Sequence, residues 1–145
     1  MKLKSFGCSF IFGSELPDDG SHANYDHYSR LSWPALLAKT LGYNYARAGS
    51  GNLRIMERVL SQAACNDHSL YVIGWSWIDR FDYVLSGLDL ANPFELPHWQ
   101  TLLPSDTSNV ANTYYKKLHS QLKDKLTTLT CIKLTIDTLK QKQCP

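Results

Sequence analysis

Residues 5–20 read SFGCSFIFGSELPDDG, and this stretch decides the fold. Residues 3–8 read as a short buried run that breaks at Gly7-Cys8, and Ser9 follows directly. The chain then passes Gly13 and enters an acidic loop that holds a proline and a glycine. Such a run predicts a buried β-strand that ends in a tight turn. Two candidate nucleophiles, a thiol and a hydroxyl, therefore stand at the end of a strand.

The order of strand, glycine-bearing loop and helix recurs downstream. Helices are predicted over 33–41 and from Asn52 to Ala63, and strands over 43–48 and 70–73. Ser32 and Asn52 are the expected N-caps, because their side-chain oxygens accept hydrogen bonds from the first free backbone N–H groups of a helix. Strands that alternate with helices indicate an α/β fold with a parallel sheet.

The second half of the chain is less regular. Residues 85–109 carry three prolines and little periodicity, so we expect an irregular insertion or lid. A long amphipathic helix is predicted over 110–139, with one apolar stripe facing the core. That stripe comprises Tyr115, Leu118, Leu122, Leu129, Ile132, Ile136 and Leu139. Such a helix is normally followed by a further strand, so we expect the sheet to be truncated at its C-terminal end. Residues 1–145 are expected to form a single domain.

Composition excludes several classes of function. The net charge of +2 on 145 residues is too small for a nucleic acid or an anionic membrane as the main partner. No apolar run approaches the ~20 residues of a membrane span, and the start lacks the apolar core of a signal peptide. We therefore expect a cytoplasmic protein. The four cysteines have no Cys-x-x-Cys spacing, so no metal site, disulfide or cofactor is expected.

In open parallel sheets, ligands bind beyond the carboxyl ends of the strands. Three loops follow the predicted strands, over residues 7–13, 49–52 and 74–80. We expect these loops to converge and to form the functional site.

The three loops also carry a resemblance to a known family. Residues 6–13, FGCSFIFG, resemble the first signature block of the SGNH (GDSL-like) hydrolases, and residues 48–52, AGSGN, resemble the family's glycine block. Residues 73–77, IGWSW, fall where the family has Gly-x-Asn-Asp. The combination of Phe-Gly-Cys-Ser-Phe with the later Gly-Trp and Asp-Arg pairs is similar to SGNH-like proteins of phages and marine microbes. The resemblance implies a three-layer, flavodoxin-like α/β fold with Ser9 as the nucleophile, and Cys8 is then assigned to packing.

The resemblance also implies an oxyanion hole. Its donors would be the N–H of Ser9 and the N–H of Gly49 or, in a shifted alignment, of Gly51. The family's third donor is an asparagine side chain, and Ser76 stands at that position. Asn52 is a substitute donor if its side chain turns inward, although a cap is its expected role.

Substrate contacts are expected from Trp75, Trp77 and Arg80. The two indole rings suit stacking on a sugar ring or an acyl chain, and equally suit the cover of a lid. Arg80, with Asp79 and Asp82, suits either a polar substrate or an exposed ion pair.

The base that would activate Ser9 is missing from its expected place. SGNH enzymes carry an Asp-x-x-His block near the carboxyl end, and this sequence has none. His119 is predicted to lie inside the long helix, whereas His22 and His27 lie in a loop close after Ser9. The sequence is therefore a fragment, or has lost the activity, or receives the base from a partner chain.

Three functions follow from these observations. The first is a serine hydrolase of an acyl or O-acetyl ester, with a small-molecule or carbohydrate ester as substrate. The alternative is a catalytically inactive SGNH scaffold that serves as a binding or structural module. The weakest is a phosphate-binding loop, since the Gly-x-Gly-x-x-Gly and Gly-Lys-Ser/Thr patterns are absent. The thin sheet and the long striped helix further predict a homodimer.

Overall fold

The computed structural model describes residues 2–18, 28–38, 42–85 and 99–144. At its centre lies a parallel sheet in the order β2-β1-β3. The strands are β1 (Leu3–Gly7), β2 (Gly42–Asn44) and β3 (Leu70–Gly74). Gly7 pairs with Gly74, so the two longer strands end at the same level. The α/β class and the parallel sheet are confirmed.

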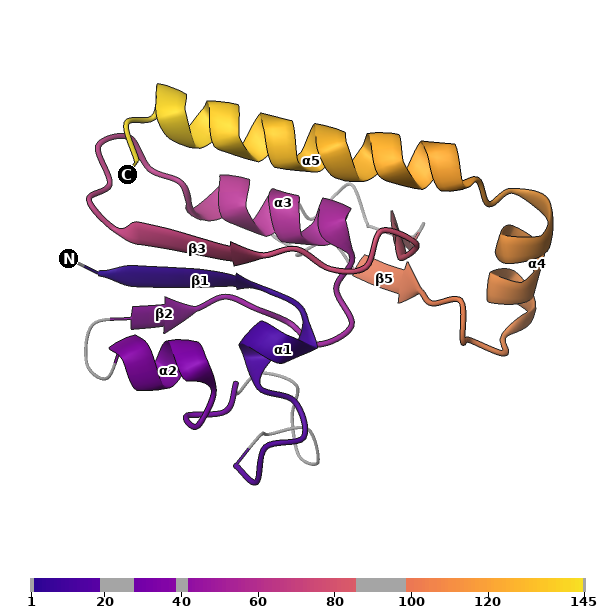
Figure 1. Ribbon diagram of the computed structural model, residues 1–145, viewed down its shortest axis with the longest axis horizontal. Coiled ribbons are helices and arrows are strands. Elements are labelled where there is room, and N and C mark those ends of the chain that lie inside the picture. The colour runs from indigo at the N-terminus through magenta and orange to yellow at the C-terminus, as the bar shows by residue number, and fades with distance from the viewer. Residues whose placement is uncertain (1, 19–27, 39–41, 86–98, 145) are drawn as a thin grey trace, which may run out of the picture.

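Helices flank the sheet on both sides (Figure 1). On one side lie α1 (Ser9–Phe12) and α2 (Trp33–Ala38), and on the other lies α3 (Asn52–Gln62). The long C-terminal helix α5 (Gln121–Gln141) runs along the outer side of α3. Beyond the carboxyl ends of the strands lie an antiparallel pair, β4 (Phe81–Val84) and β5 (Trp99–Leu102), and the helix α4 (Asn109–Lys117).

Alternation along β1 explains the two faces of the sheet. Phe6 is fully buried and packs against Ile55 and Val59 of α3. Its ring stacks between those of Tyr45 and Tyr71, at centroid distances of 5.1 and 5.8 Å. Leu3 and Ser5 point to the opposite face, toward α2.

A polar cluster ties the start of β1 to the turn before β3. The Lys4 ammonium donates to the carboxylate of Asp67 and to the carbonyl oxygen of Gln62. The hydroxyl of Tyr71 also donates to Asp67, at 2.7 Å. Hydrogen bonds to its carboxylate, first from Lys4 and then from Ser69 and Tyr71, hold the pKa of Asp67 well below its usual range.

The lowered pKa of Asp67 predicts acid sensitivity. Because the folded state holds the carboxylate charged, its stabilisation is complete above the unfolded-state pKa, about 3.8, and is lost as the pH falls below that value. The unfolding free energy should therefore fall as the pH is lowered from about 5 to about 2. It should fall more steeply in the native chain than in Asp67→Asn. Urea titrations across that range measure both slopes, and equal slopes would contradict the role of Asp67.

Two expectations for the C-terminal half are wrong. The single helix over 110–139 is two helices, α4 and α5, separated by residues 118–120. The buried side of α5 also differs in part. Its buried residues are Asp124, Thr128, Cys131 and Thr135, whereas of the expected stripe Leu139 does pack against the core around Phe6. Four members of the expected core stripe are instead exposed, namely Leu118, Leu122, Leu129 and Ile136. The expected homodimer stays a prediction, which light scattering tests.

The buried hydroxyl of Thr135 on α5 leads to a prediction about stability. Thr135 is fully buried, and its hydroxyl has no hydrogen-bond partner within the described ranges. Replacing it with the isosteric valine removes an unpaired buried polar group and should raise the unfolding free energy by about 1 kcal/mol. Thr127→Val, at an exposed position of the same helix, is the control and should change it little. A loss of stability in Thr135→Val would contradict the assignment.

Several local expectations also need correction. The insertion over 85–109 is not irregular throughout, since residues 99–102 form β5, while 86–98 lie outside the described residues. Ser32 stands at the N-cap position of α2, as expected: its carbonyl oxygen accepts from the N–H of Leu36, while its hydroxyl donates to the carbonyl oxygen of Ser29. Asn52 is the first residue of α3, and Gly51 occupies the N-cap position. Among the helices described, none has the length and apolar character needed to cross a membrane.

Candidate functional site

The loops that follow the three parallel strands meet at one edge of the sheet. The N–H of Arg47 donates to the carbonyl oxygen of Gly7 at 3.0 Å, so the chain beyond β2 runs past the end of β1. On the other side, Gly74 closely approaches Gly7, where an added Cβ would lie 2.8 Å from the Gly74 oxygen. Cys8 and Ser9 therefore emerge between the loop at 47–52 and the loop after Gly74.

Ser9 opens the one-turn helix α1, with Cys8 as its N-cap. Ser9 is half-buried and lines an open pocket of about 340 Å³, together with Phe10, Glu15 and Trp33. Cys8 is buried, as expected of a packing residue.

Gly49 lies in the turn before α3, at a positive φ of 75° that favours glycine. No atom lies within 4 Å of where its Cβ would be, so this side of the loop is open. The backbone N–H groups of Ser9 and Gly49 make no hydrogen bond within the part of the chain that the structure describes. Neither group is therefore committed to a hydrogen bond in those ranges, although Gly49 is not among the described residues that line the Ser9 pocket.

The N–H of Gly51 is already engaged. It donates to the carboxylate of Asp82 at 2.9 Å, and the N–H of Arg54 donates to the same group, also at 2.9 Å. Thr101 of β5 adds a third hydrogen bond at 2.6 Å. Asp82 is thus buried and caps α3 from a distant strand, instead of forming an exposed ion pair. Burial lowers the pKa of Arg54, and the charge of Asp82 opposes that shift.

The side chain of Asn52 is engaged as well. Its oxygen accepts from the N–H of Ser76 at 2.7 Å, and its amide group donates to the Ser76 carbonyl oxygen and to Thr128. Asn52 therefore joins the start of α3 to the exit of β3 and to α5. The hydroxyl of Ser76 is buried and has no partner among the residues described.

The expected substrate-binding residues point in different directions. Trp75 is half-buried and packs against the core around Phe6, whereas Trp77 is exposed. The guanidinium of Arg80 donates to the carbonyl oxygen of Ser50 at 3.1 Å. Trp75 and Arg80 therefore support the site's framework, and of the three only Trp77 presents its ring to solvent.

No histidine contacts Ser9 within the described ranges. His119 lies between α4 and α5, outside any helix, with its Nε2 2.7 Å from the carboxylate of the buried Asp124. Figure 1 shows this junction well away from α1. His68 is exposed, and His22, His27 and His98 lie outside the described residues. Those ranges also hold no group of three His, Cys, Asp or Glu side chains suited to a metal.

Sequence reasoning missed two features of this region, the cap by Asp82 and the His119–Asp124 pair. Asp82 accepts its hydrogen bond from Gly51, 31 positions away in the chain, so no local sequence pattern predicts this contact. The pair depends on the break between α4 and α5 at residues 118–120, where the sequence predicted one continuous helix. A weak signal existed in Ser120, whose hydroxyl accepts from the Lys123 N–H at the start of α5.

The chain was compared with protein-family models, curated proteins and solved structures, and none of them matches it.

Proposed function

We propose that the chain has the flavodoxin-like scaffold of an SGNH-type serine hydrolase and that Ser9 accepts the acyl group of an acyl or O-acetyl ester. The position of Ser9 carries the proposal. It follows the central strand of a parallel sheet, at the edge where such sheets bind ligands, and it lines an open pocket.

The free N–H groups of Ser9 and Gly49 are the proposed oxyanion donors. In the first step the Ser9 oxygen bonds to the acyl carbon, the hydroxyl proton passes to water, and the alcohol leaves with a proton. Water then hydrolyses the acyl-serine and restores the hydroxyl. Since no imidazole contacts Ser9 in the described residues, we expect acylation to be slow and to accelerate with rising pH.

The test is hydrolysis of p-nitrophenyl acetate by the purified chain. Ser9→Ala should reduce the rate to the uncatalysed background. Ser14→Ala is the matched control, because Ser14 lines the same pocket and should leave the rate within about two-fold of the native chain, as expected of a residue without a catalytic role. Equal rates in both variants would contradict the proposal.

A second candidate, a non-catalytic binding module, is favoured by the engaged donors at Gly51 and Asn52. Loss of one oxyanion donor costs about 100–1,000-fold in rate, and here two of the expected groups are committed to the framework. This candidate predicts background ester hydrolysis in every variant, together with retention of a bound saccharide by Ser9→Ala. Ester hydrolysis above background by the native chain distinguishes the two candidates, and equilibrium dialysis with an acetylated oligosaccharide tests the binding that the second candidate requires.

A further inference from the structure

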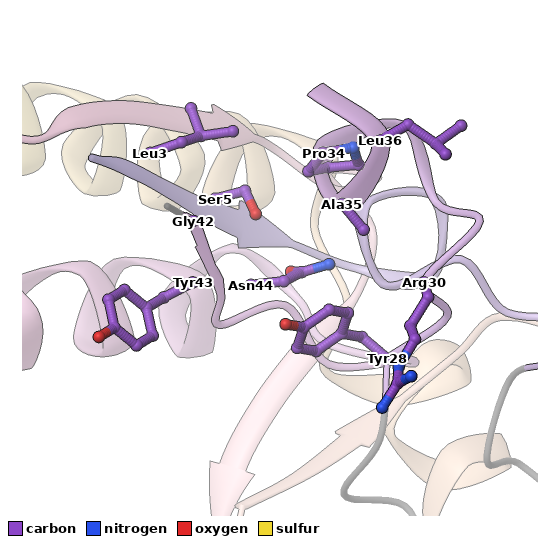
Figure 2. A pocket seen from close by; sticks show the side chains of 10 residues that line it. All are labelled: Leu3, Ser5, Tyr28, Arg30, Pro34, Ala35, Leu36, Gly42, Tyr43 and Asn44. Carbon is purple, nitrogen blue, oxygen red and sulfur yellow. The ribbon is translucent and has the colours of Figure 1, made fainter. Parts of the chain in front are cut away.

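A second cavity lies between α2 and the sheet, on the face opposite α3 (Figure 2). Its volume of about 460 Å³ is within the range of small-molecule sites. The space exists because small residues meet there, namely Ser5 on β1, Gly42 on β2 and Ala35 on α2. None of the described residues that line it belongs to the Ser9 pocket.

Ser5 gives this cavity a polar group that lacks a partner. Its side chain is 1% exposed, and its oxygen makes no hydrogen bond within the residues described. In Figure 2 that oxygen points into the space between Ala35 and Asn44. A buried hydroxyl without a partner is destabilising, so its retention on the central strand calls for an explanation. A ligand with a hydroxyl group would satisfy it.

Asn44 does not compete for this role. Its amide group donates to the carbonyl oxygen of Ile11 at 2.8 Å, and its oxygen accepts from the N–H of Ala46 at 3.0 Å. Among the described lining residues, the polar side-chain groups left for a ligand are the hydroxyls of Ser5, Tyr28 and Tyr43 and the guanidinium of Arg30. In Figure 2 the hydroxyl of Tyr43 points away from Ser5 and Ala35.

Arg30 supplies a positive charge at the rim. Its side chain is exposed beside the ring of Tyr28, and no carboxylate pairs with it in the described ranges. The nearby carboxylate of Asp18 accepts from the hydroxyl of Ser29 and from the backbone N–H of Arg30, at 2.8 Å for the latter. The guanidinium is therefore able to bind an anionic group of a ligand.

Apolar side chains of the described residues form further parts of the wall. Leu3 lies on the strand side, and Pro34 and Leu36 lie on the α2 side. These walls suit a compact carbon skeleton between a hydroxyl at one end and an anion at the other.

We propose that this cavity binds a small hydroxycarboxylic acid, with its hydroxyl on Ser5 and its carboxylate on Arg30. The proposal is independent of ester hydrolysis at Ser9, because the two pockets have no lining residue in common among those that the structure describes.

The test uses two hydroxy acids of different shape, 4-hydroxybenzoate and 6-hydroxyhexanoate, in calorimetric titrations of the full chain. At least one should bind saturably at millimolar concentration. Ser5→Ala should weaken the binding of 4-hydroxybenzoate or 6-hydroxyhexanoate about 3- to 10-fold. The affinity for the matching acid without the hydroxyl, benzoate or hexanoate, should not change.

Arg30→Gln should weaken the acids about 10-fold and leave the matching alcohol, 4-hydroxybenzyl alcohol or hexane-1,6-diol, unchanged. Lys133→Gln, on the exposed side of α5, is the charge-matched control and should change no affinity. The Ser5→Ala chain should melt no lower than the native chain, which separates a binding defect from a folding defect. Failure of both hydroxy acids to bind, or equal effects of Ser5→Ala on acids with and without the hydroxyl, would overturn the proposal.

Discussion

Replacing Phe6 with alanine should lower the unfolding free energy by about 3–5 kcal/mol, the usual cost of truncating a fully buried aromatic side chain. Phe6 is 0% exposed and belongs to the cluster of buried apolar side chains between the sheet and α3, with Ile55 and Val59. Its loss removes the ring that Tyr45 and Tyr71 sandwich and opens a cavity under Val59. Domains of this size have only about 5–15 kcal/mol of stability, so the variant should be close to unfolding.

Phe10→Ala is the matched control for this prediction. Phe10 lies four residues later and is 76% exposed, so its truncation should change the unfolding free energy by about 0.5 kcal/mol or less. Urea denaturation followed by tyrosine and tryptophan fluorescence measures both variants. A similar small loss in Phe6→Ala would mean that the centre of the sheet is not packed as described.

The second large effect is expected at Asp82. Asp82→Ala leaves the N–H groups of Gly51 and Arg54 and the hydroxyl of Thr101 without their acceptor. Loss of a helix cap together with a newly unpaired buried donor should cost about 2–4 kcal/mol. Asp82→Asn keeps one side-chain carbonyl oxygen and should lose less.

Asp137→Ala controls for loss of a carboxylate as such. Asp137 forms an exposed pair with Lys133 on α5, and such pairs contribute about 0.5 kcal/mol or less. Chemical denaturation of the three variants at neutral pH tests the order. If Asp82→Ala is no less stable than Asp137→Ala, the cap of α3 by β4 is not a stabilising contact.

Local pattern predicted most of the sheet and its adjoining helices. Each parallel strand could be located because an apolar run ends near a glycine, and β1 and β3 end within one residue of the expected positions. The second strand is shorter than expected, although the N–H groups of Tyr45 and Arg47 continue the ladder onto β1. Parallel pairing and the carboxyl-edge loops then follow from the alternation of strands and helices.

The errors on α5 have a physical cause. This helix exposes Leu122, Leu126 and Leu129 and buries Thr128, Cys131 and Thr135, so its sequence holds two competing stripes. Hydrophobic periodicity favours the leucine side, whereas the structure turns the small side toward α3. The hydrogen bond between Asn52 and Thr128, 76 positions apart, contributes to that choice and cannot be read from local sequence.

The candidate site was only partly predictable for the same reason. Because the predicted first strand ends at Gly7-Cys8-Ser9, Ser9 could be placed at the carboxyl end of the parallel strands. Whether the groups at Gly51 and Asn52 are free depends on Asp82 and Ser76, which lie on other loops. Contacts of this range decide the number of free donors, and only the folded chain reveals them.

The most direct test of the central claim, that Ser9 is the acyl-accepting residue, is covalent labelling with a fluorophosphonate followed by peptide mass spectrometry. The account predicts one slowly formed adduct on the peptide that contains Ser9, present in Ser14→Ala and absent from Ser9→Ala. No adduct after prolonged incubation at high pH, or an adduct that persists in Ser9→Ala, would contradict it.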